Sequence, residues 1–235
     1  GRTHSYSGCG GCTATYCTTG CGAGAHISLE KRIPVAAGLA GGSADAAAVL
    51  RGLNRLWGLG LSHGELAAPA LELGSDVPYC LAGGLAAATG RGECLTPLPP
   101  LPGGWQCVLA DPGIPVRAAR AYTHPLLEKC GPPPEGERWT SRFRQAVTLA
   151  AGGRLGELVF NRLERPVFHD HPVLAAIKET LLACGARAAA MSGSGSVLFG
   201  LFQETDPVEE AVAALKRSFP EVTAHRCRFS PETTA

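Results

Sequence analysis

The sequence contains no apolar run close to the ~20 residues that a transmembrane helix requires. It also shows no basic start followed by an apolar block, the pattern of a secretory leader. Charge is scarce and balanced, since only 17% of the 235 residues are charged and the formal net charge is +1. With no basic run, nucleic acid and anionic membrane surfaces are disfavoured as partners. We therefore expect a soluble, cytoplasmic protein that binds a small neutral or anionic metabolite. Separately, we expect a monomer or a homodimer.

The cysteines are not evenly spaced along the sequence, which argues against a secreted disulfide scaffold. Four of the ten cysteines fall within the first 21 residues, namely Cys9, Cys12, Cys17 and Cys21. The other six are scattered singly and mostly have apolar neighbours, as Cys107 does in WQCVLAD. Such cysteines are typical of small buried side chains in a reducing compartment.

The opening stretch, residues 1–26, has no Leu, Ile, Val, Phe or Met and only one charged residue, Arg2. It cannot supply a core face, and every one of its letters is also a nucleotide code. We hypothesise that the native N-terminal region is missing and that this non-native or disordered stretch stands in its place. The alternative is a cysteine-rich metal-binding module, but the spacing of the four cysteines does not match a zinc site, so no metal ligands are assigned.

A strand, a loop and a helix are predicted from residue 27 onward. Ile27, Leu29 and Ile33 alternate with polar residues, which indicates a half-buried strand. Apolar residues then recur every three or four positions from Ala46 to Leu56, which indicates a helix. The loop that joins them, PVAAGLAGGSA, is rich in glycine.

This loop is suited to an anion, because the first turn of a helix offers unpaired backbone N–H groups and partial positive charge. Gly38, Gly41 and Gly42 allow positive φ angles and a close approach to phosphate. Ser43 either caps the helix or offers its hydroxyl to a phosphate or its metal. A glycine turn without a ligand is the alternative. The absence of GK[ST] excludes a Walker loop, and the spacing is not GxGxxG.

Two further stretches carry candidate site residues. Ser62 and Glu65 form a capping box for a helix that ends at Gly74, which places Asp76 at the start of the next helix, as a cap or as a catalyst. In MSGSGS, Gly193 and Gly195 form a tight turn that leads into a strand, as in a hairpin. A strand at 105–111, a helix within 171–185 and a helix after Asp206 complete the second half.

Together, PVAAGLAGGSADAA, GSDVPYCLAGG and NRLERPVF followed by MSGSGS resemble the motifs of the GHMP superfamily of small-molecule kinases. Within it they are similar to the kinases that act on 4-diphosphocytidyl-2-C-methyl-D-erythritol in the non-mevalonate isoprenoid pathway. The resemblance covers Ile27 to about Phe229. It departs at the start, where the family carries a catalytic lysine that no lysine of this sequence matches.

The resemblance implies phosphoryl transfer from ATP, with Mg²⁺ bridging the phosphates, to the C2 hydroxyl of 4-diphosphocytidyl-2-C-methyl-D-erythritol. It implies Asp76 as the residue that accepts the hydroxyl proton, with a glycine motif near the active site formed by Gly193, Ser194 and Gly195. The phosphates would lie on the backbone of Pro34, Val35, Ala36, Ala37, Gly38, Leu39, Ala40, Gly41, Gly42, Ser43 and Ala44. Because the family's lysine is missing, we expect the chain to be a poor kinase as it stands.

The implied fold is α/β in two lobes: an incomplete ATP-binding lobe related to ribosomal protein S5 at 27–102, and a ferredoxin-like lobe at 103–235. Two other functions remain open from the sequence. A GHMP-type diphosphate decarboxylase also uses a phosphate loop and an aspartate but needs no acceptor hydroxyl. An inert fragment is the non-enzymatic alternative.

Overall fold

The computed structural model describes residues 24–31, 33–101, 103–128, 145, 148 and 155–229. The chain forms two compact units. The first unit contains residues 40–97 together with the start of the chain, and the second contains residues 33–39 together with everything from Leu98 onward. The boundary therefore cuts through the glycine loop, whose first half belongs to the second unit.

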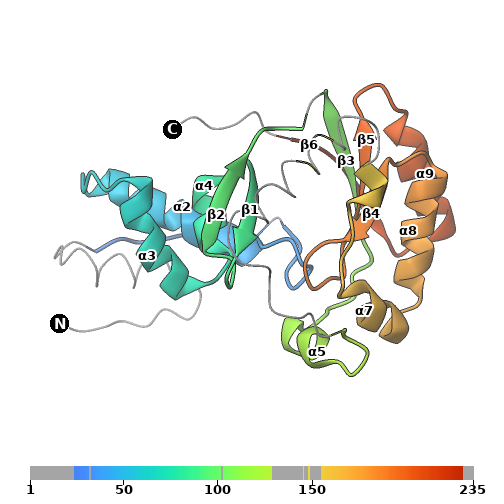
Figure 1. Cartoon of the computed structure of the whole chain (residues 1–235), viewed down its shortest axis with the longest axis horizontal. Coiled ribbons are helices and arrows are strands. Elements are labelled where there is room, and N and C mark those ends of the chain that lie inside the picture. The colour runs from blue at the N-terminus through green and yellow to red at the C-terminus, as the bar shows by residue number, and fades with distance from the viewer. Residues whose placement is uncertain are drawn as a thin grey trace. The chain divides into compact units, whose positions relative to one another are not determined.

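In the described part of the first unit, helices α2, α3 and α4 enclose a small core, and a two-stranded sheet follows them (Figure 1). The elements are α2 (Gly41–Leu56), α3 (His63–Leu73), α4 (Val77–Ala82), β1 (Leu85–Thr89) and β2 (Cys94–Leu98). The buried side chains of the helical core are Ala47, Leu50, Leu66, Ala70, Val77 and Leu81. The predicted helices at 46–56 and 62–74 are confirmed, because this apolar spacing lets each helix turn one face to the others.

The predicted capping box of α3 is present. The Ser62 hydroxyl accepts a hydrogen bond from the Glu65 backbone, and the Glu65 carboxylate accepts one from the Ser62 backbone. Gly74 ends the helix, and Pro69 lies inside it without ending it. These reciprocal bonds satisfy N–H groups that would otherwise lack partners at the helix start.

The strand predicted over Ile27–Ile33 is wrong for the part that the structure describes, since residues 24–31 belong to no strand or helix. Leu29 and Ile33 are both more than 40% exposed. Alternation alone does not make a strand, because the backbone also needs a neighbouring strand with which to exchange hydrogen bonds. Within the described residues, the sheet of this unit consists of β1 and β2 only.

The second unit is built on a four-stranded antiparallel sheet in the order β4-β5-β3-β6. Its elements are β3 (Trp105–Asp111), α5 (Ala118–Thr123), η1 (Leu155–Glu157), α7 (Glu164–Asp170), α8 (Val173–Ala183), β4 (Ala188–Met191), β5 (Leu198–Gln203), α9 (Val208–Ser218) and β6 (Thr223–Arg228). Helices α8 and α9 lie on the same face of the sheet (Figure 1). This βαββαβ arrangement confirms the predicted ferredoxin-like lobe and the α/β class.

The sheet has an apolar face on each side because its side chains alternate. Leu198 and Phe202 of β5 pack with Leu174, Ile177 and the other core residues on the helical side. Leu201 packs with Cys107, Ala188 and Leu155 on the opposite side. Burial raises the pKa of the Cys107 thiol to about 12, as expected for a cysteine that acts as a small apolar side chain.

Across the described part of the chain, none of the helices has the length and apolar character needed to cross a membrane. The cysteine group Cys9, Cys12, Cys17 and Cys21, and all but the last three residues of the proposed non-native stretch 1–26, lie outside the described residues.

Candidate active site

The first half of the glycine loop lies against the turn between β4 and β5. The Ser192 hydroxyl donates a hydrogen bond to the Gly38 carbonyl oxygen at 2.8 Å. The Val197 N–H donates to the Ala37 carbonyl oxygen at 3.2 Å. Pro34–Leu39 and the predicted glycine motif Gly193–Gly195 therefore lie together in the second unit, although more than 150 residues separate them in the sequence.

Gly38 is essential to this contact. Its φ angle is +76°, and a Cβ atom built on it would lie 2.0 Å from the Ser192 carbonyl oxygen. Gly193 on the other side is also too close for a side chain, since its Cβ would lie 2.9 Å from the Gly38 carbonyl oxygen. The two backbones are thus in direct contact, an approach that only glycine permits.

The predicted positive φ angles at Gly41 and Gly42 are wrong, because both residues already belong to helix α2. The left-handed conformations fall instead on Ala36, with φ +56°, and Ala40, with φ +49°. Alanine is rare in this region, where its Cβ is close to the backbone carbonyl oxygen. The loop thus reverses through Ala36, Gly38 and Ala40 before the helix begins.

Helix α2 begins without a side-chain cap. Ala40 occupies the N-cap position, and its side chain makes no cap hydrogen bond. Ser43 is the third residue of the helix, so its predicted capping role is wrong, whereas its hydroxyl remains at the helix start with Gly41, Gly42 and Ala44. The backbone N–H groups of this first turn therefore keep their capacity to bind an anion.

Asp76 occupies the N-cap position of α4, in the first unit, but its carboxylate makes no capping hydrogen bond. The side chain is exposed, and within the described residues no hydrogen bond or ion pair engages it. Helix α4 packs directly on α2. The unit thus carries Asp76 and the start of α2 on two neighbouring helices.

Three polar residues with contacts in one unit or the other escaped prediction. The Asn161 side chain binds the backbone of the glycine turn, and Glu164 binds the backbone of Met191 just before it. Both lie in NRLERPVF, a stretch recognised only as a motif. In the first unit, Lys31 forms an ion pair with Asp45 of α2. The spacing of Asn161 and Glu164, three residues apart at the start of a helix, is visible in the sequence. Their backbone partners lie 27 or more residues away, and no local pattern identifies them.

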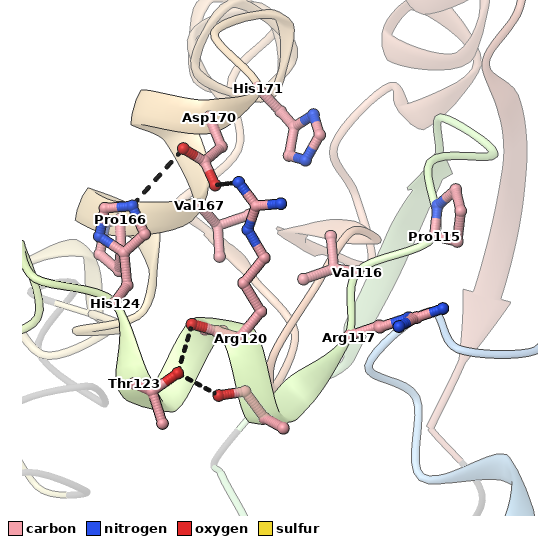
Figure 2. Close-up of a pocket in the computed structure, with 12 residues that line it drawn as sticks. Pro115, Val116, Arg117, Arg120, Thr123, His124, Pro166, Val167, Asp170 and His171 are labelled. Carbon is pink, nitrogen blue, oxygen red and sulfur yellow. Dashed lines mark hydrogen bonds and ion pairs between the residues drawn. The ribbon is translucent and has the colours of Figure 1, made fainter.

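A separate pocket of about 570 Å³ lies in the second unit, between α5 and α7. Figure 2 shows apolar residues such as Val116 and Val167 beside polar side chains. The polar lining residues are Arg117, Arg120, Thr123, His124, Asp170 and His171. This pocket was not predicted from the sequence, because its walls come from segments about 50 residues apart.

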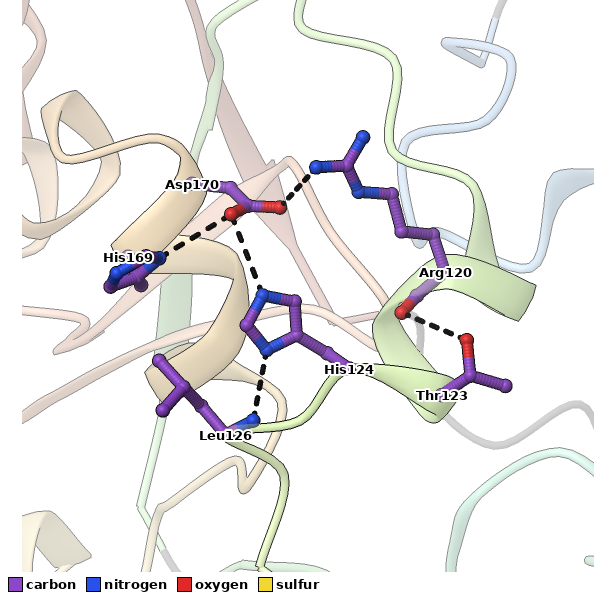
Figure 3. Close-up of polar contacts among 6 residues, drawn as sticks. All are labelled: Arg120, Thr123, His124, Leu126, His169 and Asp170. Atoms are coloured by element: carbon purple, nitrogen blue, oxygen red, sulfur yellow. Dashed lines mark hydrogen bonds and ion pairs between the residues drawn. The ribbon is translucent and has the colours of Figure 1, made fainter.

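One edge of the pocket is a cluster centred on Asp170 (Figure 3). One carboxylate oxygen lies 3.5 Å from His124 Nε2 and 3.4 Å from His169 Nδ1, and the other lies 2.9 Å from Arg120 Nη2. The Leu126 N–H donates to His124 Nδ1 at 3.1 Å, so a neutral His124 carries its proton on Nε2, facing Asp170. Metal-bound histidines instead donate from their second nitrogen, which favours a hydrogen-bonded cluster here over a metal site.

These contacts predict a pH dependence. The hydrogen bond from His169 lowers the pKa of Asp170 below its ordinary value, and the charges of Arg120 and His124 act in the same direction. A carboxylate with a lowered folded-state pKa contributes stability above its unfolded pKa and loses it as the pH falls through the folded pKa. Asp170→Asn should therefore lower the urea midpoint at neutral pH, and the difference from wild type should shrink as the pH falls through the lowered folded-state pKa of Asp170. A pH-independent difference would contradict this account.

The fold and the two glycine segments are those expected of the GHMP kinase superfamily, and comparisons with known proteins agree. The model for the GHMP kinases N terminal domain matches residues 10–84, and that for GHMP kinases C terminal matches residues 144–221. Within this superfamily, the chain belongs to the 4-diphosphocytidyl-2-C-methyl-D-erythritol kinase family. Relatives of that name from Gloeobacter violaceus and from Synechococcus sp. (strain JA-3-3Ab) are 43% and 44% identical over 84% and 88% of the chain.

A solved structure supports the same family. The crystal structure of a 4-(cytidine 5'-diphospho)-2C-methyl-D-erythritol kinase is 33% identical and has a TM-score of 0.70, over 94% of this chain and 77% of that one. The chain spans 65% of the length of the Gloeobacter relative and 68% of the Synechococcus one.

Proposed function

We propose that the chain is an ATP-dependent kinase that phosphorylates the C2 hydroxyl of 4-diphosphocytidyl-2-C-methyl-D-erythritol. The observation that carries this proposal is the uncapped start of α2, which follows directly on a loop bound to the glycine turn. Kinases need such a cradle because phosphoryl transfer depends on positioning and on stabilising negative charge. The names of the relatives supply the acceptor substrate.

The residues present fit ATP and Mg²⁺. At Gly42, a Cβ atom would meet nothing within 4 Å, so the first turn of α2 has open space for a phosphate group. The backbone N–H groups of that turn would hold the phosphate oxygens. The Ser43 hydroxyl would supply an oxygen ligand, and Mg²⁺ takes its remaining ligands from phosphates and water. When bound, ATP supplies the transferred phosphoryl group and Mg²⁺ neutralises its charge.

Asp76 would accept the proton of the attacking hydroxyl. Its carboxylate is exposed and has no capping hydrogen bond, so it is available to a substrate. A carboxylate can orient a hydroxyl through a hydrogen bond and take its proton as the bond to phosphorus forms. Acting as the proton acceptor therefore requires only that the Asp76 carboxylate, at the start of α4, is accessible to the substrate.

Gly42→Val tests the cradle without disturbing the fold. The new side chain enters open space at the start of α2. It should lower the affinity for Mg-ATP by about tenfold or more, since it occupies the volume of the phosphate. Isothermal calorimetry measures the affinity, and thermal unfolding checks the fold.

Gly52→Val is the matched control. Gly52 lies later in the same helix, and its Cβ would also meet nothing within 4 Å. This variant should bind Mg-ATP as wild type does. Equal affinities for the two variants would exclude the start of α2 as the phosphate site.

Product analysis separates the kinase from the alternatives. Incubation with Mg-ATP and 4-diphosphocytidyl-2-C-methyl-D-erythritol should yield ADP and a singly phosphorylated acceptor. A diphosphate decarboxylase would release CO₂ from a carboxylated substrate and leave this acceptor unchanged, and an inert fragment would leave ATP intact. The related proteins identified above are all named kinases, which favours the first outcome.

A further inference from the structure

The glycine turn between β4 and β5 is held by the side chain of one asparagine. Asn161 Nδ2 donates hydrogen bonds to the Met191 carbonyl oxygen at 2.8 Å and to the Gly193 carbonyl oxygen at 2.7 Å. Its Oδ1 accepts from the Leu163 N–H at 2.9 Å. The amide is therefore fixed at both ends, with Nδ2 bound to two carbonyl oxygens where β4 ends and the turn begins.

A charged pair holds the strand that leads into the turn. Glu164 Oε1 accepts from the Met191 N–H at 2.8 Å, and its Oε2 lies 2.6 Å from Lys178 Nζ of helix α8. Asn161 and Glu164 thus bind the carbonyl oxygen and the N–H of the same residue, Met191. This fixes the residue that precedes the turn from both sides of its backbone.

The glycine turn is hydrogen-bonded to the glycine loop. The Ser192 hydroxyl binds the Gly38 carbonyl oxygen, and the Val197 N–H binds the Ala37 carbonyl oxygen. A contact chain therefore runs from Asn161 through the turn to the loop that precedes α2. Among the described residues, Asn161 makes no hydrogen bond to Ala37 or Gly38. Its effect on these two residues therefore passes through the turn.

We propose that Asn161 is a positioning residue for nucleotide binding: it sets the geometry of the glycine turn, and the turn sets the position of Ala37 and Gly38. The expected effect on ATP affinity rests on the proposed function. The expected effect on the turn and the loop does not, because it can be measured in the absence of nucleotide.

Asn161→Asp is the most direct test, because it keeps the shape of the side chain and replaces its donor with a carboxylate oxygen. That oxygen would face two carbonyl oxygens, so both hydrogen bonds are lost and repulsion is added. Hydrogen exchange at the Val197 amide should become faster by about tenfold or more. The Kd for Mg-ATP, measured by calorimetry, should rise, whereas exchange at Val108 in the sheet core should be unchanged.

Asn54→Asp is the matched control. Asn54 Nδ2 donates to the Leu61 carbonyl oxygen at 2.9 Å, and its Oδ1 accepts from the Leu61 N–H at 3.0 Å, within the first unit. The same substitution there removes a comparable bond without touching the turn. It should leave exchange at Val197 and the Kd for Mg-ATP at their wild-type values. Asn161→Ala, which removes the donor without adding charge, should act in the same direction as Asn161→Asp and replaces it if that variant does not fold.

Unchanged Val197 exchange in a folded Asn161 variant would overturn the proposal, as would faster exchange with wild-type Mg-ATP affinity. If the wild-type chain itself bound no Mg-ATP, the proposed function would fail, and the exchange data would still decide whether Asn161 positions the loop.

Discussion

Asp76→Asn should lower turnover by about 100- to 10,000-fold, the usual contribution of a general base, while the chain keeps its fold and its affinity for Mg-ATP. Asparagine is as favourable as aspartate at a helix N-cap, so α4 should retain its stability. The Asp76 side chain makes no capping bond, which removes the main structural reason for a change in folding. Steady-state kinetics with acceptor and Mg-ATP measure turnover, and calorimetry measures nucleotide affinity.

Glu72→Gln provides the control for removing a negative charge from the same unit. Glu72 lies exposed on α3, outside the residues assigned to the site. Its loss should leave turnover unchanged. Turnover of Asp76→Asn within a few-fold of wild type would return Asp76 to a helix-start role.

The sequence predicted the helices well, because their signals are local. The apolar spacing of α2, the capping box at Ser62 and the hairpin at Gly193 each depend on a few neighbouring residues, and each is present. The ferredoxin-like order of the sheet came from the family resemblance. Strand pairing is a long-range property, so periodicity alone does not determine it.

The backbone angles of the glycine loop were harder to predict. Three glycines suggested three positive φ angles, but two of those angles fall on Ala36 and Ala40. The positions of glycines show where a left-handed conformation costs little energy. The hydrogen bonds between the loop and the glycine turn determine where such conformations occur. The close approach at Gly38 depends on Ser192, 154 residues away, and no local pattern records it.

The residues missed by prediction act through the backbone. Asn161 binds two carbonyl oxygens, and Glu164 binds an N–H group. Such bonds depend on the path of the partner chain rather than on the identity of its residues. Asp76 was recognised because its role was inferred from a motif, whereas Asn161 became visible only once the turn was in place.

Gly38→Ala should weaken Mg-ATP binding by about 5- to 150-fold, from an overpacking cost of about 1 to 3 kcal/mol. The added Cβ would lie 2.0 Å from the Ser192 carbonyl oxygen and 2.9 Å from the Gly195 nitrogen, both of them backbone atoms that cannot rotate away. The loop must therefore move from the glycine turn, which releases the bonds at Gly38 and Ala37. Calorimetry with Mg-ATP measures the effect, and faster hydrogen exchange at Val197 reports the lost contact.

Gly58→Ala separates this clash from the cost of the left-handed conformation itself. Gly58 has a φ angle of +60°, close to that of Gly38, but its Cβ would meet nothing within 4 Å. The control should therefore lose about 1 to 2 kcal/mol of unfolding free energy and keep its affinity for Mg-ATP. If Gly38→Ala bound Mg-ATP as tightly as Gly58→Ala, the contact between the loop and the turn would have no part in nucleotide binding. If only Gly38→Ala loses affinity for Mg-ATP, nucleotide binding requires glycine at this position because the two backbones approach each other so closely.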